Sequence, residues 1–120
     1  MKRIRIAAIC AAQALILASP AAGHAFLDHA LPPVGGTVRS PPEEVRLWFT
    51  QELEPAFSTV SVQDANGKRV DKADVKVEGD GAVMRVSLPK LDPGRYKVTW
   101  RALSVDTHVT EGDFTFEVAR

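Results

Sequence analysis

The chain has 120 residues, in which 15 lysines and arginines are balanced by 15 aspartates and glutamates. Three of the basic residues, and no acidic one, fall within the first 23 positions, so residues 24–120 carry 12 basic and 15 acidic side chains, a net charge of −3. This acidic balance makes nucleic acid and anionic membrane surfaces poor candidate partners.

Residues 1–23 have the three parts of a secretory signal peptide: a basic start, an apolar middle and small residues ending at Gly23. The apolar middle is shorter than the roughly 20 residues that a transmembrane helix needs. We expect signal peptidase to cut between Gly23 and His24, with cuts after Ala22 or Ala25 as alternatives. The sequence therefore predicts an exported, periplasmic protein that is not embedded in a membrane.

Removal of this segment leaves residues 24–120 as one domain of 97 residues, near the lower end of what can build a sufficient core unaided. The single cysteine of the chain, Cys10, lies in the predicted signal peptide. The mature domain therefore has no thiol and no disulfide, and its stability must come from packing, helped by a metal if one binds.

The mature sequence alternates apolar and polar residues with a period of two, which predicts β-strands. Strands are expected over the segments 45–50, 59–64, 82–88, 95–103 and 114–118, with two less regular ones near Leu27 and at 75–77. Turn sequences rich in Gly, Pro, Asn and Asp separate them. Short alternating strands of this kind predict two antiparallel sheets packed face to face, an all-β immunoglobulin-like sandwich of about seven strands.

Three aromatic side chains on these strands have different expected places. Tyr96 and Trp100 share the apolar face of their strand and are interpreted as core residues. Trp48 is out of phase with the apolar face of its own strand. We interpret it either as an aromatic on the sheet surface or as a lid near a site.

The histidines suggest a metal site. As a mature N-terminus, His24 would offer its α-amine and its imidazole Nδ1, which close a six-membered chelate ring on a metal. Asp106 and His108 are two residues apart, so an extended segment over 105–109 would send both side chains to the same side. Three nitrogens and one oxygen suit tetragonal Cu(II). The alternative is that this spacing is accidental, and His29 is interpreted as a surface or turn residue outside the site.

Other chemistries fail for lack of the necessary residues. The mature chain has no cysteine, no glycine-rich phosphate loop and no nucleophile elbow. Ser104 lies near Asp106 and His108, but the spacing places Asp106 nearest to it, whereas a serine triad needs the histidine in between. We therefore expect no catalytic residues and no enzyme activity.

Three blocks of the mature sequence together resemble the CopC family of periplasmic copper-resistance proteins. Any one block is weak evidence, but their order and spacing over the whole mature chain make the resemblance strong. The blocks are the opening His24-Ala25-Phe26-Leu27 with the following Ala30–Gly36, the strand Val45–Leu53, and the segment Gly94–His108 followed by Gly112 and Phe114–Phe116.

This resemblance implies a Greek-key β-sandwich that binds one Cu(II) ion per chain. The implied ligands are the amine and imidazole of His24, together with Asp106 and His108. The leading function is then a copper carrier or buffer in copper homeostasis and resistance, which sequesters the ion or passes it to an inner-membrane copper transport protein. We expect the protein to be a monomer.

Two departures limit the resemblance. Some relatives have a methionine-rich Cu(I) loop, whereas this mature chain has only Met84, inside a predicted strand, so we expect Cu(II) binding alone. Some also have a glutamate near the copper where this chain has Gln51 beside Glu52, which leaves a contact from either residue open. Two other functions stay as alternatives: a copper-dependent oxygenase with an N-terminal histidine brace, and a metal-free immunoglobulin-like interaction domain.

Overall fold

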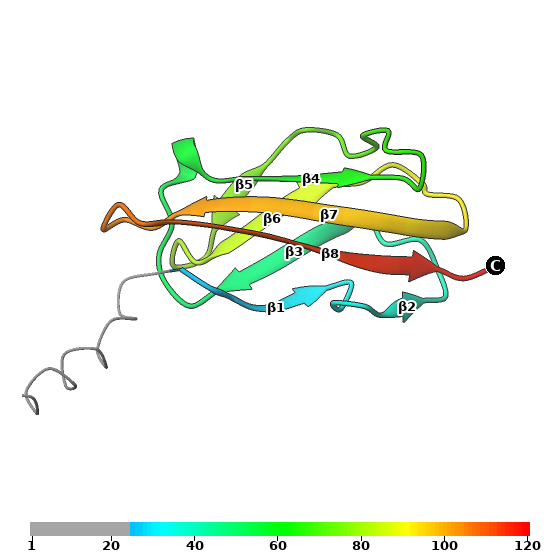
Figure 1. Cartoon of the computed structure of the whole chain (residues 1–120), viewed down its shortest axis with the longest axis horizontal. Coiled ribbons are helices and arrows are strands. Elements are labelled where there is room, and N and C mark those ends of the chain that lie inside the picture. The colour runs from blue at the N-terminus through cyan, green and yellow to red at the C-terminus, as the bar shows by residue number, and fades with distance from the viewer. Residues whose placement is uncertain (1–24) are drawn as a thin grey trace, which may run out of the picture.

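A computed structural model describes residues 25–120 of the chain as two four-stranded sheets packed face to face (Figure 1). One sheet has the order β1-β3-β6-β5 and the other β2-β8-β7-β4. The strands are β1 (Leu27–Leu31), β2 (Thr37–Val38), β3 (Glu44–Phe49), β4 (Thr59–Gln63), β5 (Lys76–Glu78), β6 (Val83–Ser87), β7 (Gly94–Leu103) and β8 (Val109–Val118), with a 3₁₀ turn, η2 (Pro55–Phe57), before β4. The predicted all-β sandwich is confirmed.

The described part of the chain has eight strands rather than about seven, because β2 was not predicted. It pairs with the end of β8 in parallel, Thr37 opposite Glu117 and Val38 opposite Val118. All other strand pairs are antiparallel. A strand of two residues has no alternation to detect, so only its pairing defines it.

The core lies between the sheets and follows the predicted alternation. Along β7, Tyr96, Val98, Trp100 and Ala102 are all buried, which confirms the expected core placement of both aromatics. Phe114, Phe116 and Val118 of β8 lie beside them on the same sheet, and Val45, Leu47 and Phe49 of β3 close the core from the other sheet. Burying each large apolar side chain contributes about 1.5–3 kcal/mol.

Glycine is required at one point in this core. Trp100 lies across Gly112, its partner on β8, and a Cβ atom at position 112 would stand 2.7 Å from Cζ2 of the indole. Any side chain there would push a buried ring out of place. Gly112 therefore lets Trp100 pack flat against its own sheet.

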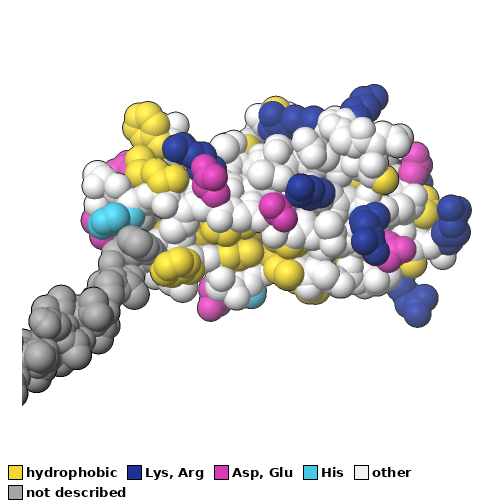
Figure 2. Space-filling view, in the orientation of Figure 1, with side chains coloured by type: hydrophobic (Ala, Val, Ile, Leu, Met, Phe, Trp, Pro, Cys, Tyr) yellow, Lys and Arg dark blue, Asp and Glu magenta, His cyan; other side chains and the backbone are white. Residues whose placement is uncertain are grey.

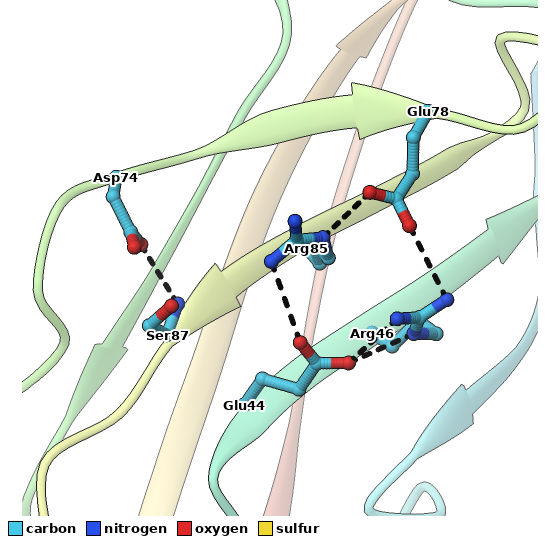
Figure 3. A network of polar contacts seen from close by, with 6 residues as sticks. All are labelled: Glu44, Arg46, Asp74, Glu78, Arg85 and Ser87. Carbon is cyan, nitrogen blue, oxygen red and sulfur yellow. Dashed lines mark hydrogen bonds and ion pairs between the residues drawn. The ribbon is translucent and has the colours of Figure 1, made fainter.

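The outer face of the β1-β3-β6-β5 sheet carries a closed ring of ion pairs from Glu44, Arg46, Glu78 and Arg85 (Figure 3). Each carboxylate contacts both guanidinium groups, with N to O distances of 2.9 and 3.4 Å for Arg46 and 3.5 and 2.7 Å for Arg85. The ring covers the sheet opposite its apolar face and joins β3, β5 and β6.

The two ends of the sandwich are formed by different segments of the chain. The turn between β7 and β8 projects at the left end of Figure 1, where the chain also enters β1. No helix within residues 25–120 is long and apolar enough to cross a membrane. The predicted signal peptide and His24 lie outside the described residues.

Candidate metal centre

The segment between β7 and β8 is a tight turn, so the condition considered in the sequence analysis, an extended segment over residues 105–109, is not met. Leu103 pairs directly with Val109, and the chain must therefore reverse within five residues. The N–H of Thr107 donates to the carbonyl of Ser104 at 2.8 Å, and Thr107 has a φ of 73°, in the left-handed region. Turn geometry rather than strand alternation sets the side-chain directions here.

The turn nevertheless brings Asp106 and His108 together, as the sequence predicted. Oδ1 of Asp106 is 3.3 Å from Nδ1 of His108, and their side chains are 48% and 52% exposed. A carboxylate oxygen and an imidazole nitrogen thus stand side by side at one end of the sandwich, open to solvent. Across residues 25–120, no group of three or more His, Cys, Asp or Glu side chains is arranged to hold a metal ion.

The environment of Asp106 favours its ionised form. The pKa of this carboxyl is lowered from its ordinary value of 3.8, chiefly because the hydroxyl of Ser104 donates a hydrogen bond to Oδ1. Partial desolvation acts in the opposite direction, and the hydrogen bond and electrostatic attraction of His108 lower the pKa further. Asp106 is therefore a negatively charged oxygen donor throughout the neutral range.

The beginning of the described chain is fixed beside this turn. Ala25 is fully buried, and its carbonyl accepts a 2.6 Å hydrogen bond from the hydroxyl of Thr110, two residues after His108. Phe26 donates its N–H to the hydroxyl of Thr50 at 3.0 Å, and its carbonyl accepts the N–H of Thr50 at 2.9 Å. These bonds hold the chain that follows position 24 at the same end as Asp106 and His108.

Gln51 and Glu52 both lie near this end and are exposed. The carbonyl of Glu52 accepts the N–H of Val105 at 3.1 Å, which ties the segment after β3 to the β7–β8 turn. The side chain of Glu52 covers Gly81, where a Cβ atom would stand 2.6 Å from its Cγ. The side chain of Glu52 thus packs over the turn before β6. Whether Gln51 or Glu52 contacts a metal stays an open question.

Three other residues considered in the sequence lie away from the turn. His29 is on β1, where its ring stacks on Trp48 with centroids 4.3 Å apart and its Nδ1 lies 2.7 Å from Asp28. Trp48 also meets Arg46, 5.8 Å from its ring centroid, which supports its interpretation as an aromatic on the sheet surface. Met84 is fully buried in β6, so its thioether faces the core.

Sequence reasoning correctly placed Asp106 nearest to Ser104, but it missed that Ser104 and other polar residues support the turn. A signal was present: Ser104 continues the buried phase of Tyr96, Val98, Trp100 and Ala102, and only 1% of it is exposed. A hydroxyl at a buried position needs a hydrogen-bonding partner. Thr110 and Thr50, by contrast, gave no signal, because their partners are 85 and 24 residues away in the chain.

Exposed apolar side chains gather around the same end of the molecule. Phe26, Phe57, Val105 and Val109 are between 45% and 64% exposed, and they are four of the six large apolar side chains exposed within residues 25–120. Figure 2 shows apolar side chains grouped at the left end, which carries the β7–β8 turn in Figure 1. The two donors therefore stand within a partly apolar surface.

Comparison with known sequences gives a consistent result. A model of the CopC domain matches residues 27–119. Protein YobA of Escherichia coli K12 is 33% identical over 97 residues, covering 79% of this chain and 78% of its own. Copper resistance protein C of Pseudomonas syringae pv. tomato is 33% identical over 93 residues, covering 72% of this chain and 74% of its own. Copper transport protein CutJ of Bacillus subtilis is 29% identical over 122 residues, which include all of this chain but 23% of that protein.

Solved structures agree with the sequence matches. CopC from Methylosinus trichosporium OB3b superposes with a TM-score of 0.75 and 36% identity, over 80% of this chain and 94% of that one. PcoC, a methionine-rich copper resistance protein from Escherichia coli, gives a TM-score of 0.71 and 30% identity, over 79% of this chain and 98% of that one. Both fold and sequence are shared over nearly the whole of these relatives.

Proposed function

The chain belongs to the CopC family, and on that premise we propose that it is a copper-binding protein of copper resistance that carries or buffers one Cu(II) ion per chain. The proposed ligands are the α-amine and imidazole of His24, a carboxylate oxygen of Asp106 and an imidazole nitrogen of His108. The observation that carries this proposal is the pairing of Asp106 with His108 beside the anchored start of the described chain.

Covalent geometry supports a contribution from His24. Consecutive Cα atoms are about 3.8 Å apart. Ala25, the residue after His24, accepts a hydrogen bond from Thr110, which lies two residues after His108. An N-terminal amine one residue before Ala25 would begin next to the turn. With three nitrogens and one oxygen, the four donors fit the tetragonal geometry that Cu(II) prefers.

The proposed role is transfer or storage rather than catalysis. The similar proteins are named for copper resistance and copper transport, which favours neither the oxygenase nor the metal-free interaction domain. We propose that the mature protein is a periplasmic monomer that delivers copper to an inner-membrane transport protein. The presence of a similar domain as 23% of CutJ supports such a partnership, and the exposed apolar side chains around the turn suit contact with a partner.

The proposal is tested by titrating the exported protein with Cu(II) against a competing chelator, after intact mass has verified its N-terminus. A matched protein carries one extra residue before His24, which converts the free amine into an amide. We expect tight one-to-one binding in the first protein and its loss in the second, because the chelate ring of the N-terminal histidine can no longer form. The loss should leave the melting temperature of the metal-free protein unchanged.

The possible results separate the alternatives. Equal tight binding by both proteins would remove the amine from the site. Weak binding by both would contradict a copper role and leave the metal-free domain. Rapid peroxide production by the copper-loaded protein with a reductant would instead revive the oxygenase.

Copper affinity is expected to fall as the pH is lowered from about 8 to 5. The nitrogen donors must lose their protons to bind, and the reference pKa values of an α-amine and an imidazole are about 7.7–8.0 and about 6.5. Asp106 adds nothing to this fall, because its pKa is lowered from 3.8 and it stays ionised over the whole range. Chelator competition at several pH values checks this, and a pH-independent affinity would contradict nitrogen ligation.

A further inference from the structure

Ser104 is a buried residue that contacts both proposed donor residues, Asp106 and His108. It comes directly after β7 and continues the buried phase of Ala102, and 1% of its surface is exposed. Its backbone bridges to Leu53 on one side, while its N–H donates to the carbonyl of His108 at 3.0 Å. Backbone contacts alone therefore fix the position of Ser104, independently of its hydroxyl.

The hydroxyl of Ser104 contacts both donor residues. Oγ donates a short hydrogen bond to Oδ1 of Asp106 and accepts the backbone N–H of His108 at 3.2 Å. A hydroxyl has one hydrogen and two lone pairs, so it can make both contacts at once. Oγ is also 3.3 Å from the carbonyl oxygen of His108, but its single hydrogen favours the shorter contact with Asp106.

Two of these contacts meet at one atom of the Asp106 carboxylate. The hydroxyl of Ser104 and Nδ1 of His108 meet the same carboxylate oxygen, Oδ1 of Asp106. The side chain of Asp106 is 48% exposed, so an ion can approach the carboxylate from solvent. In the His108 tautomer that donates from Nδ1, the nitrogen that carries the lone pair is Nε2.

We infer that Ser104 is a positioning residue for copper, which holds the Asp106 carboxylate through Oδ1 and fixes the backbone of His108. The inference rests on the proposed function and assigns no copper contact to Ser104 itself. Donors that are already oriented lose less conformational freedom when the ion arrives. The Cu(II) affinity should therefore depend on the hydroxyl of Ser104, although this hydroxyl does not contact the ion.

A second buried serine at this end provides a matched control. Ser58 is 5% exposed, and its Oγ accepts the N–H of Leu103 at 3.0 Å, one residue before Ser104. Ser58→Ala and Ser104→Ala each remove one buried, hydrogen-bonded hydroxyl from neighbouring places. They differ in that only the hydroxyl of Ser104 contacts Asp106 and His108 among the bonds described.

The experiment measures both variants and the wild type as exported proteins with a verified N-terminus. Ser104→Ala is expected to raise the Cu(II) dissociation constant by about 10–100-fold, the usual cost of losing a group that orients a metal ligand, and to change the Cu(II) hyperfine pattern in electron paramagnetic resonance. Ser58→Ala should leave both unchanged while lowering the melting temperature by a comparable amount. In the metal-free proteins, the amide of His108 should exchange faster with solvent in Ser104→Ala alone.

Wild-type affinity and an unchanged spectrum in Ser104→Ala would overturn the inference. Equal losses of affinity in the two variants would also overturn it, because they would assign the effect to general destabilisation. Failure of the wild type to bind copper would instead overturn the proposed function, and with it any role of Ser104 toward copper. The wild-type titration thus tells the two failures apart.

Discussion

Replacement of His108 with alanine is expected to weaken Cu(II) binding by more than about 100-fold, because loss of a direct ligand should cost more than the 10–100-fold typical of a group behind it. The fold should persist. The side chain of His108 is 52% exposed, and the backbone bonds between His108 and Ser104 do not involve the imidazole. Exposed substitutions of this kind usually change stability by less than about 0.5 kcal/mol. Chelator competition and thermal unfolding measure the two effects separately.

His29→Ala is the matched control for this prediction. His29 is exposed to a similar extent, 56% of its side chain, but it lies on β1 against Trp48 rather than in the turn. Its replacement should leave copper affinity unchanged. Equal affinity losses in the two variants, or an unfolded His108→Ala protein, would contradict the assignment of the site to the turn.

Asp71→Ala is expected to lower the free energy of unfolding by about 3 kcal/mol, since a buried charged group would lose its hydrogen bonds. The side chain of Asp71 is 0% exposed. Its Oδ1 accepts the N–H of Val62 at 2.8 Å, its Oδ2 accepts the N–H of Ala73 at 3.0 Å, and Arg69 contacts both oxygens. Its removal leaves two backbone donors without their acceptor and loosens the loop between β4 and β5.

Thermal and denaturant unfolding check this prediction, and a loss of 3 kcal/mol corresponds to a melting temperature lower by roughly 12–24 °C in a domain of this size. Asp80→Ala is a suitable control, because Asp80 is exposed in the turn before β6. Copper affinity should be unaffected by Asp71→Ala at temperatures where the variant is folded, since Asp71 binds Val62, whose partner Val98 lies five residues before the end of β7 at Leu103. A melting temperature equal to that of the wild type would contradict the role of Asp71.

The effect of Asp71 should depend on pH. Desolvation is the largest influence and raises the pKa of Asp71, but the hydrogen bonds from Arg69, Val62 and Ala73 outweigh it and leave the pKa below 3.8. A carboxyl whose pKa is lower in the folded state stabilises the protein above its unfolded-state value and loses that contribution as the pH falls through the folded-state value. The stability difference between wild type and Asp71→Asn should therefore shrink below about pH 4.

Much of the fold could be predicted because a half-buried strand imposes a period of two on its sequence. Val45, Leu47 and Phe49 of β3 and Phe114 and Phe116 of β8 are buried, as their alternation indicated. The two residues of β2 could not be predicted, because their strand conformation depends on a partner near the end of the chain. Local patterns describe single strands well and distant pairings poorly.

The candidate site was predicted less completely. Asp106 and His108 do lie side by side, but a turn with Thr107 at positive φ brings them together, and not the extended segment considered in the sequence analysis. Threonine does not favour a positive φ, so the local sequence did not predict the turn. The buried hydroxyl of Ser104 and the anchoring of Ala25 by Thr110 depend on tertiary contacts. The ligation of copper by His24, Asp106 and His108 stays a prediction.

The ion-pair ring on the outer face of the β1-β3-β6-β5 sheet has a consequence for stray metal ions. Glu44 and Glu78 each face two guanidinium groups, so these four side chains have no net charge. A divalent cation that wanders over this face meets carboxylates already neutralised by arginine, and capture would require it to displace a guanidinium. Asp106, paired with a histidine, presents no such competitor. The two glutamates of the ring are thereby protected against adventitious copper, whereas an ion that bound Asp106 would displace no arginine.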